Sequence, residues 1–398
     1  MVYLIVLVIL LLLTVHYDIN GKTKYRNQWY SAITIILILI AGLRFRLGDD
    51  TLNYIYMFYY DTPNLSKIDI DTLLSSDQPP LWILLNSIVK TLGGKFYVVQ
   101  LIQAAFLNIL MLKFFKKHSL YPFACTALYF FWRYQWYSMV VMKAAIALSI
   151  ILFANDYFLE KKYIKGWLLM LFATGFHQSS LVLFITPFLL FLRFNKLGII
   201  SLVCAFFIGA FLQSQLGDVF ALFDAAEGVS NKLDDYLNSD WMDNNHNMGY
   251  YIFYVFPLIL YPILSLIYIK RNCKDSPILK LEPFIISALL FQLMQFSIDM
   301  LYRYIYVFTP YYILYIVHYF IQFSMNSLSL KKSLAFVRTF AILIPLLAPL
   351  GYRWKPFTHH GFNPYSSVIE RGFDEEREKY YCTRTHFGNH YQKNRDYY

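Results

Sequence analysis

Long apolar runs recur along almost the whole chain, and this feature most constrains what it can fold into. The sequence is 58% hydrophobic and only 15% charged over 398 residues, whereas a soluble protein would cover its core with far more charge. Only helices and closed barrels satisfy their backbone hydrogen bonds in lipid, and continuous runs without strict alternation exclude a barrel. The sequence therefore predicts an all-α, polytopic integral membrane protein.

Twelve of these runs are predicted to cross the membrane, although several fall short of the roughly 20 residues that a straight span needs. They are 1–15, 29–43, 96–112, 120–132, 144–159, 164–176, 179–192, 197–212, 250–269, 283–298, 304–323 and 334–350. A further run, 79–92, is short, opens with two prolines and closes at a pair of glycines. We interpret it as a re-entrant or interfacial segment.

Basic residues collect in alternate loops and thereby indicate orientation. With the N-terminus outside and 79–92 not crossing, the cytoplasmic loops carry seventeen lysines and arginines and the outer loops between spans only nine, while the outer loops 44–79 and 213–249 are acidic. This follows the positive-inside rule. If 79–92 crossed, Lys113, Lys116 and Lys117 would lie outside and the pattern would break. The net charge of +10 thus indicates orientation and not a nucleic-acid partner.

Two domains are predicted from composition. Residues 1–351 form the membrane domain, and 352–398 form a polar tail, rich in tyrosine and histidine, that would lie outside with little fixed structure. The four cysteines are scattered without a CxxC spacing, which indicates neither a disulfide framework nor a zinc site.

The candidate site begins where the second span leaves the bilayer. Arg44, Arg46, Gly48, Asp49 and Asp50 lie within seven residues there. Ionisable groups at a membrane boundary cost solvation free energy unless they serve a site. The structural alternative is a polar loop with arginines whose head groups reach back to water.

The predicted topology brings further polar residues to the same outer face. They are Arg133 and Lys143, which bracket an aromatic loop with Trp136 and Tyr137; His177, between two spans; and Asp299 and Arg303, before a late span. Guanidinium groups grip phosphate with forked, charge-assisted hydrogen bonds, and several together can hold a pyrophosphate. We therefore predict an anion site from Arg44, Arg46, Arg133, Lys143 and Arg303, with Trp136 and Tyr137 stacking on sugar rings. Each arginine could instead anchor a span end, and Asp299 could pair with Arg303 along a helix.

The order of these motifs resembles the EpsG-like, Wzy-type polysaccharide polymerases. The resemblance covers roughly Trp29 to Phe323 and rests on Gly42-Leu43-Arg44 with Gly48, Asp50 and Tyr54; on Lys143 opening an alanine-rich span; on Phe176-His177 with Ser179; and on Arg303-Tyr304. One departure is Lys143, where the family usually has arginine, so that a point charge replaces a bidentate fork.

The resemblance implies a membrane glycosyltransferase with a GT-C-like fold. Such an enzyme joins oligosaccharide repeat units carried on undecaprenyl pyrophosphate, at the outer face of the bacterial cytoplasmic membrane, for capsule, exopolysaccharide or O-antigen. The implied partners are the lipid-linked oligosaccharide, membrane lipid, and flippase and chain-length regulator proteins. We predict no cofactor and no metal, although Asp49 and Asp50 are chemically able to ligate one.

The catalytic assignment leaves alternatives open. A carboxylate or imidazole must take the proton of the acceptor hydroxyl, and we assign this role to Asp50 first and to His177 second. Asp50 could instead orient Arg44 or Arg46. Rival functions are a flippase or transporter for lipid-linked sugars, an O-antigen ligase and an O-acyltransferase. The transporter would want charges along a mid-membrane path, and the acyltransferase a histidine within a span, for which only His318 is a candidate.

Overall fold

The fold is described from a computed structural model of the chain. It describes residues 2–69, 73, 76, 78–223, 248–250, 256–274, 276–297, 301–326 and 361–384, without the side chains of 213–223, 250, 302–303 and 380–384. These residues are mostly helical, and among them the only β-type pairing is an isolated antiparallel bridge between Arg44 and Ser367. The chain divides into two compact units, Met1–Phe184 with Arg353–Tyr398, and Ile185–Tyr352.

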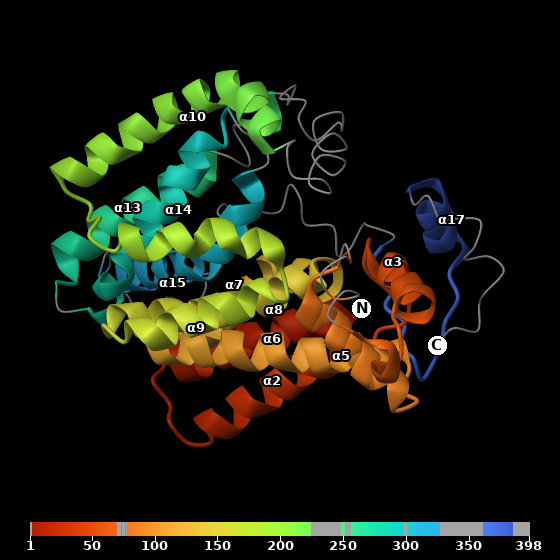
Figure 1. Cartoon of the computed structure of the whole chain (residues 1–398). Coiled ribbons are helices and arrows are strands. Elements are labelled where there is room, and N and C mark those ends of the chain that lie inside the picture. Colours follow the sequence, from red (N-terminus) through yellow and green to blue (C-terminus); the bar gives the residue numbers. More distant parts are fainter. Residues whose placement is uncertain are drawn as a thin grey trace. The chain divides into compact units, whose positions relative to one another are not determined.

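The first unit is a bundle of antiparallel helices (Figure 1). Helix α2 packs against α6, α6 against α8, α8 against α9, and α1 against α7. The bounds are α1 Val2–Leu13, continued by the π-helical η1 Thr14–Ile19; α2 Arg26–Gly42; α3 Thr51–Tyr56; η2 Met57–Asp61; η3 Leu65–Lys67; α5 Pro80–Thr91; α6 Phe96–His118; α7 Pro122–Trp132; η4 Trp136–Val140; α8 Met142–Leu159; α9 Tyr163–Thr174; and α17 Glu375–Arg384. The 3-10 helix η5, Gln178–Leu189, carries the chain into the second unit.

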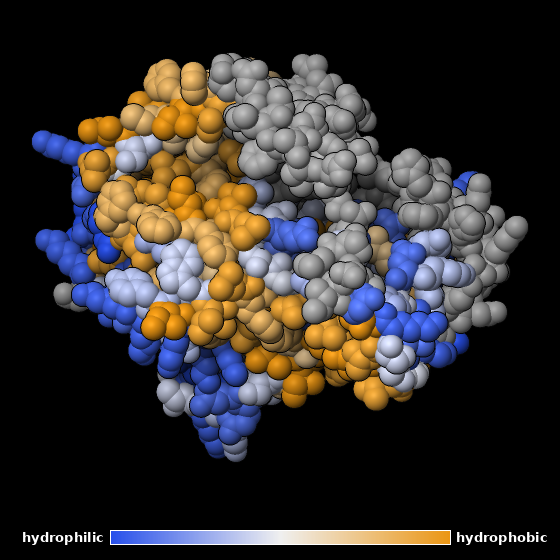
Figure 2. Space-filling model, viewed as in Figure 1, coloured by the Kyte–Doolittle hydropathy of each residue, from blue (hydrophilic) through white to orange (hydrophobic). Residues whose placement is uncertain are grey.

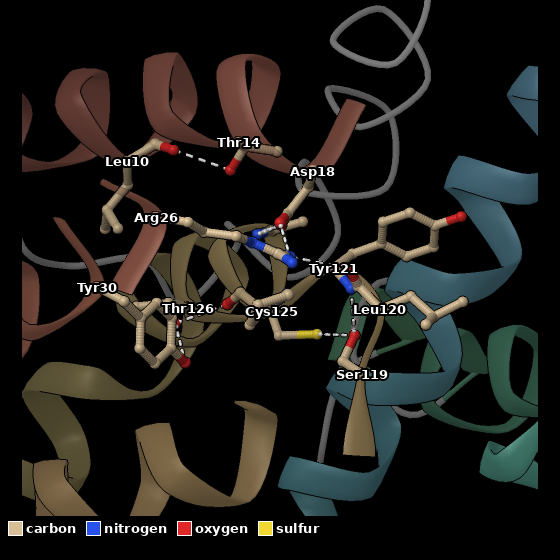
Figure 3. Close-up of polar contacts among 12 residues, drawn as sticks. Leu10, Thr14, Asp18, Arg26, Tyr30, Ser119, Leu120, Tyr121, Cys125 and Thr126 are labelled. Atoms are coloured by element: carbon tan, nitrogen blue, oxygen red, sulfur yellow. Dashed lines mark hydrogen bonds and ion pairs between the residues drawn. The ribbon is translucent and has the colours of Figure 1, made fainter. Parts of the chain in front are cut away.

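One end of this bundle gathers the loops that were predicted to be cytoplasmic. Arg26 donates to the Asp18 carboxylate at 3.0 Å and to the Leu120 carbonyl at 3.2 Å (Figure 3). The Ala124 N–H donates to the same carboxylate at 2.9 Å. Beside this network, Lys117 pairs with Asp156 at 2.8 Å. The turns 18–26, 117–124 and 156–160 therefore meet at one end of the bundle, as alternate turns of an antiparallel bundle must.

The opposite end gathers the loops that were predicted to be outside. The Leu81 N–H, at the start of α5, donates to the Gly175 carbonyl just after α9. At the other end of α5, Lys90 donates to the carbonyls of Tyr59 and Thr62 at 2.9 and 2.6 Å. Both ends of α5 thus bond to segments on the same side of the bundle, which is the arrangement expected of a re-entrant or interfacial segment.

The second unit packs its helices around α14. Helix α14 (Glu282–Met294) contacts both α10 (Lys196–Phe223) and α15 (Tyr302–Asn326), and α13 (Phe256–Asn272) packs on α15. The short elements α12 (Met248–Tyr250) and η7 (Pro277–Leu281) complete the described helices. Glu282 holds this unit at one end, since it accepts from Lys270 at 2.8 Å and from the Phe194 N–H.

Five of the described helical stretches are long and apolar enough to cross a membrane. They are Val2–Ile19, Phe96–His118, Met142–Leu159, Pro277–Met294 and Tyr304–Met325. Apolar side chains cover much of the visible surface (Figure 2), for example Ile164 and Leu168 on α9 and Phe207 and Phe211 on α10. Large apolar side chains that face outward are costly in water and indicate contact with lipid. The all-α membrane class is therefore confirmed.

The predicted count of twelve spans and the GT-C-like fold stay predictions. Each predicted span that falls on described residues coincides with a helix, but several of these helices are short, such as α7 and α9. The predicted span 334–350 lies outside the described residues, as does much of the outer loop 213–249.

The orientation can be tested by cysteine labelling in intact cells. A membrane-impermeant thiol reagent should label a cysteine at Asn64 and should not label one at Lys116, because both positions are exposed but lie at opposite ends of the first unit. Labelling at Lys116 from outside would place the site end of the bundle in the cytoplasm. That result would contradict the predicted outer-face site.

Candidate functional site

Arg44 lies at the end of the first unit that was predicted to face outward, and its side chain is completely buried. Its Nε donates to the Leu47 carbonyl at 2.9 Å, and its Nη1 to the Ala41 carbonyl at 2.5 Å. Its Nη2 contacts the Met139 carbonyl at 3.5 Å and the Met142 sulfur at 3.2 Å. A guanidinium at the end of a helix can satisfy the carbonyls that the last turn leaves open. The contacts of Arg44 therefore join the end of α2 to the segment before α8.

The residues after Arg44 turn tightly around the Met139 carbonyl. Gly48 adopts φ +108°, and a Cβ on it would lie 2.2 Å from that carbonyl oxygen. Thr51 donates to the Leu47 carbonyl at 2.6 Å and lies 3.3 Å from the Met139 carbonyl. Only glycine allows both this backbone angle and this close approach.

We expect Gly48→Ala to destabilise this loop strongly. The left-handed backbone costs about 1 kcal/mol or more for alanine, and the clash with the Met139 carbonyl adds to it. Gly93→Ala is the matched control, because Gly93 also has a positive φ, +74°, but open space around its Cβ position. Thermal melting in detergent should show a much larger fall for Gly48→Ala, and equal falls would contradict the assigned contact.

The C-terminal segment docks on the same loop (Figure 1). Phe45 N–H donates to Ser366, Val368 N–H to Leu43, and Gly48 N–H to Gly361, each at 2.8 Å. Tyr365 lies against the end of α2, where its hydroxyl donates to the Ile40 carbonyl at 3.1 Å. Burial raises the pKa of Tyr365 to about 12, an effect that nearby Arg44 opposes. The described part of the tail, 361–384, therefore belongs to the folded first unit.

Arg46 is held by this tail. Its Nε and Nη2 donate to the two carboxylate oxygens of Glu378 on α17, at 2.8 and 2.6 Å. Both side chains are nearly buried, and Arg46 has a positive φ of 53°. A bidentate pair of this kind is the strongest form of charge-assisted hydrogen bond. Nothing in the sequence pattern indicates Glu378 as a partner of the site.

Lys143 stands at the start of α8 and is half-buried. Its Nζ donates to the Gln78 side-chain oxygen at 2.7 Å and lies 5.6 Å from the centre of the Tyr54 ring. Tyr54 packs edge-on against Trp82 of α5. Burial raises the pKa of the Tyr54 phenol, and the charge of Asp50 raises it further. Asp50 and Lys143 are thus both neighbours of Tyr54.

The predicted sugar-contacting residues lie on and beside η4. Tyr137 is buried and stacks against Tyr129, with ring centroids 6.3 Å apart, whereas Trp136 is half-buried. Arg133 ends α7 and lies over the Trp132 ring at 4.9 Å. Tyr137 therefore contributes to the core of the bundle, and Trp136 is the more accessible of the two.

His177 lies in the turn between α9 and η5 and is half-buried. Its backbone N–H donates to the Ala173 carbonyl at 3.1 Å. Two residues before it, Gly175 accepts the hydrogen bond from Leu81 that anchors α5. This turn therefore lies beside the start of α5, close in sequence to Gln78.

The last predicted site residues lie in the second unit. Arg303 is in the first turn of α15, and its side chain lies outside the described part of the chain, as does Asp299. His318 is buried within α15, with its Nε2 at 3.4 Å from the Ser276 hydroxyl, in a loop that was predicted to be cytoplasmic. The predicted roles of Arg303 and Asp299 stay predictions.

Comparison with protein families matches residues 27–367 to the EpsG family, and the chain belongs to that family. Comparisons with curated proteins and with solved structures gave no match. The family match indicates a membrane protein of polysaccharide synthesis, of the glycan polymerase type. It confirms the resemblance inferred from the motifs, and it ends before α17, which carries Glu378.

Proposed function

We propose that this protein is a polysaccharide polymerase that joins undecaprenyl-pyrophosphate-linked repeat units at the outer face of the cytoplasmic membrane. The products would be capsule, exopolysaccharide or O-antigen glycans. Membership in the EpsG family supports the class of reaction. The choice of substrate and membrane face is our inference from the residues below.

The observation that carries the proposal is the gathering of cationic, carboxylate and imidazole groups at one end of the first unit. Lys143 bonds Gln78 at 2.7 Å, and three residues further along, Leu81 bonds the Gly175 carbonyl beside His177. Tyr54, whose ring packs on Trp82 of α5, follows Asp50 by one helical turn, and its N–H donates to the Asp50 carbonyl. Lys143 and the turn that carries His177 thus both join the start of α5, and Asp50 lies near Tyr54, whose ring packs on α5.

The reaction would transfer a growing glycan from its lipid pyrophosphate to a sugar hydroxyl of another lipid-linked unit. The bond between the anomeric carbon and the pyrophosphate oxygen breaks, and its electron pair leaves with the pyrophosphate. Lys143 is suited to stabilise this developing charge, because it already donates a hydrogen bond at the edge of the site. Arg46 is a second cation for the same anion, provided that Glu378 moves away.

A base must take the proton of the attacking hydroxyl as the new glycosidic bond forms. Asp50 is suited to this role because it is half-buried at the start of α3 and carries a carboxylate. His177 is the other candidate. Arg44, in contrast, holds the loop that presents Asp50, so its contacts favour a positioning role.

The lysine provides the test of the anion site. Lys143→Ala should reduce polymer about a hundredfold, because a charged hydrogen bond to a transition-state oxygen is of that order in a water-poor site. Lys143→Arg should retain most activity if charge is what matters. Polymer would be measured in cells beside the amount of inserted protein, with exposed Lys116→Ala as the control. Full polymer from Lys143→Ala would refute this role.

A further inference from the structure

The C-terminal helix α17 presents an acidic side chain to a cation of the proposed site. Glu378 engages both Nε and Nη2 of Arg46, and this is the edge of a guanidinium that holds a phosphate in a bidentate manner. A carboxylate and a phosphate therefore compete for the same donors. We propose that the C-terminal segment is a built-in anionic plug, in which Glu378 occupies the pyrophosphate position on Arg46 until the lipid-linked substrate displaces it.

The burial of Arg46 supports this inference. The side chain of Arg46 is only 4% exposed while Glu378 lies on it. A pyrophosphate could reach the guanidinium only after α17 moves. Removing the carboxylate partner of a buried arginine strongly destabilises the folded protein, unless another anion replaces the carboxylate. Release of the C-terminal segment and binding of a pyrophosphate are therefore coupled, because Glu378 and the pyrophosphate compete for the positive charge of Arg46.

The contacts that hold the C-terminal segment on the loop are compatible with its reversible undocking. Besides the Arg46 pair, the contacts of the tail with the rest of the unit include backbone hydrogen bonds at Phe45, Gly48 and Val368 and the hydrogen bond from the Tyr365 hydroxyl to the Ile40 carbonyl. Arg377, next to Glu378, donates to carbonyls within the tail itself, those of Pro364 and Gly372. The tail therefore carries internal bonds that can persist when it undocks.

Glu378, the acidic group of the plug, also lies beyond the part of the chain that the family match covers. The match to the EpsG family ends at residue 367, whereas Glu378 lies eleven residues later. The family's reaction does not depend on a residue outside the family region, so a regulatory role suits Glu378 better than a catalytic one. This inference rests on the proposed function only in naming pyrophosphate as the competing anion.

The test follows undocking by thiol labelling of Ser366→Cys in the full-length protein with its native cysteines replaced. Ser366 belongs to the tail and is 4% exposed while the tail is docked on the loop, so labelling reports release of the tail. Inorganic pyrophosphate should accelerate labelling, compared with sodium chloride at matched ionic strength. Glu378→Gln should accelerate it about tenfold or more without pyrophosphate, because a charged hydrogen-bond pair is lost. Glu375→Gln, an exposed acid on the same helix, should label as the parent does.

Two results would overturn the plug. One is labelling that neither pyrophosphate nor Glu378→Gln accelerates. The other is a pyrophosphate response that persists in Arg46→Ala, which would place the competing anion elsewhere. A polymer assay separates this inference from the proposed function. Glu378→Gln should lower the concentration of lipid-linked unit needed for half-maximal rate, whereas a merely structural Glu378 would lower the maximal rate. Absence of polymer from the parent would refute the function and leave the pyrophosphate-coupled release standing.

Discussion

Replacing Arg44 with alanine should abolish polymer and also sharply reduce the amount of folded protein. The guanidinium satisfies the carbonyls of Ala41 and Leu47 and contacts that of Met139 in a fully buried place. Each buried acceptor left without a donor costs about 1–3 kcal/mol, so the loss is expected to be about 3 kcal/mol or more. Thermal melting in detergent and quantitative blotting of membranes would measure it.

The comparison variants sharpen this expectation. Arg44→Lys should recover little stability, because one ammonium cannot replace a planar fork that reaches several carbonyls. Lys113→Ala, at an exposed position, should have the same thermal stability and polymer level as the parent. If Arg44→Ala were as stable as the parent and lacked only activity, Arg44 would be a direct pyrophosphate ligand. That was its predicted role from the sequence, and the positioning role inferred from its contacts would then be wrong.

Replacing Asp50 with asparagine should stop polymer formation while leaving the protein folded. Asparagine keeps the shape of the side chain but cannot remove a proton, and a general base contributes about 10²- to 10⁴-fold to rate. Lipid-linked repeat units should still bind and accumulate. Partial activity would indicate instead that Asp50 orients a neighbouring cation through a hydrogen bond that asparagine also accepts.

His177→Gln is the matching test of the imidazole. If neutral His177 is the base, the activity of the parent should fall as pH decreases through the histidine pKa, and the variant should be inactive. If Asp50 is the base, His177→Gln should retain substantial polymer. Unchanged polymer in both variants would exclude both residues as the base.

Much of the helical framework can be predicted from apolar runs, because lipid exposure requires long apolar helices in which each backbone group is paired. The segment 79–92 shows why charge patterns add information that hydropathy alone lacks. Its helix α5 is apolar, yet its ends bond to Gly175 and to the carbonyls of Tyr59 and Thr62 on one side of the bundle.

The site was harder to predict, because its partners are far apart in sequence. Glu378 pairs with an arginine 332 positions away, and a polar tail has no periodicity that would indicate where it docks. Gln78 likewise gave no signal beyond its place before two prolines. Arg44 had a local signal, since it follows the end of α2, where open carbonyls attract a basic side chain. That location indicates a positioning role for Arg44, which is missed when arginines are considered only as ligands of an anion.

The central claim is best tested by supplying purified full-length protein with a defined undecaprenyl-pyrophosphate-linked repeat unit and no nucleotide sugar. The account predicts a ladder of lipid-linked polymers with release of undecaprenyl pyrophosphate, and predicts that Lys143→Ala and Asp50→Asn produce neither. Failure of the parent to extend any lipid-linked unit, together with movement of that intact unit across a liposome membrane, would contradict the polymerase and identify a transporter.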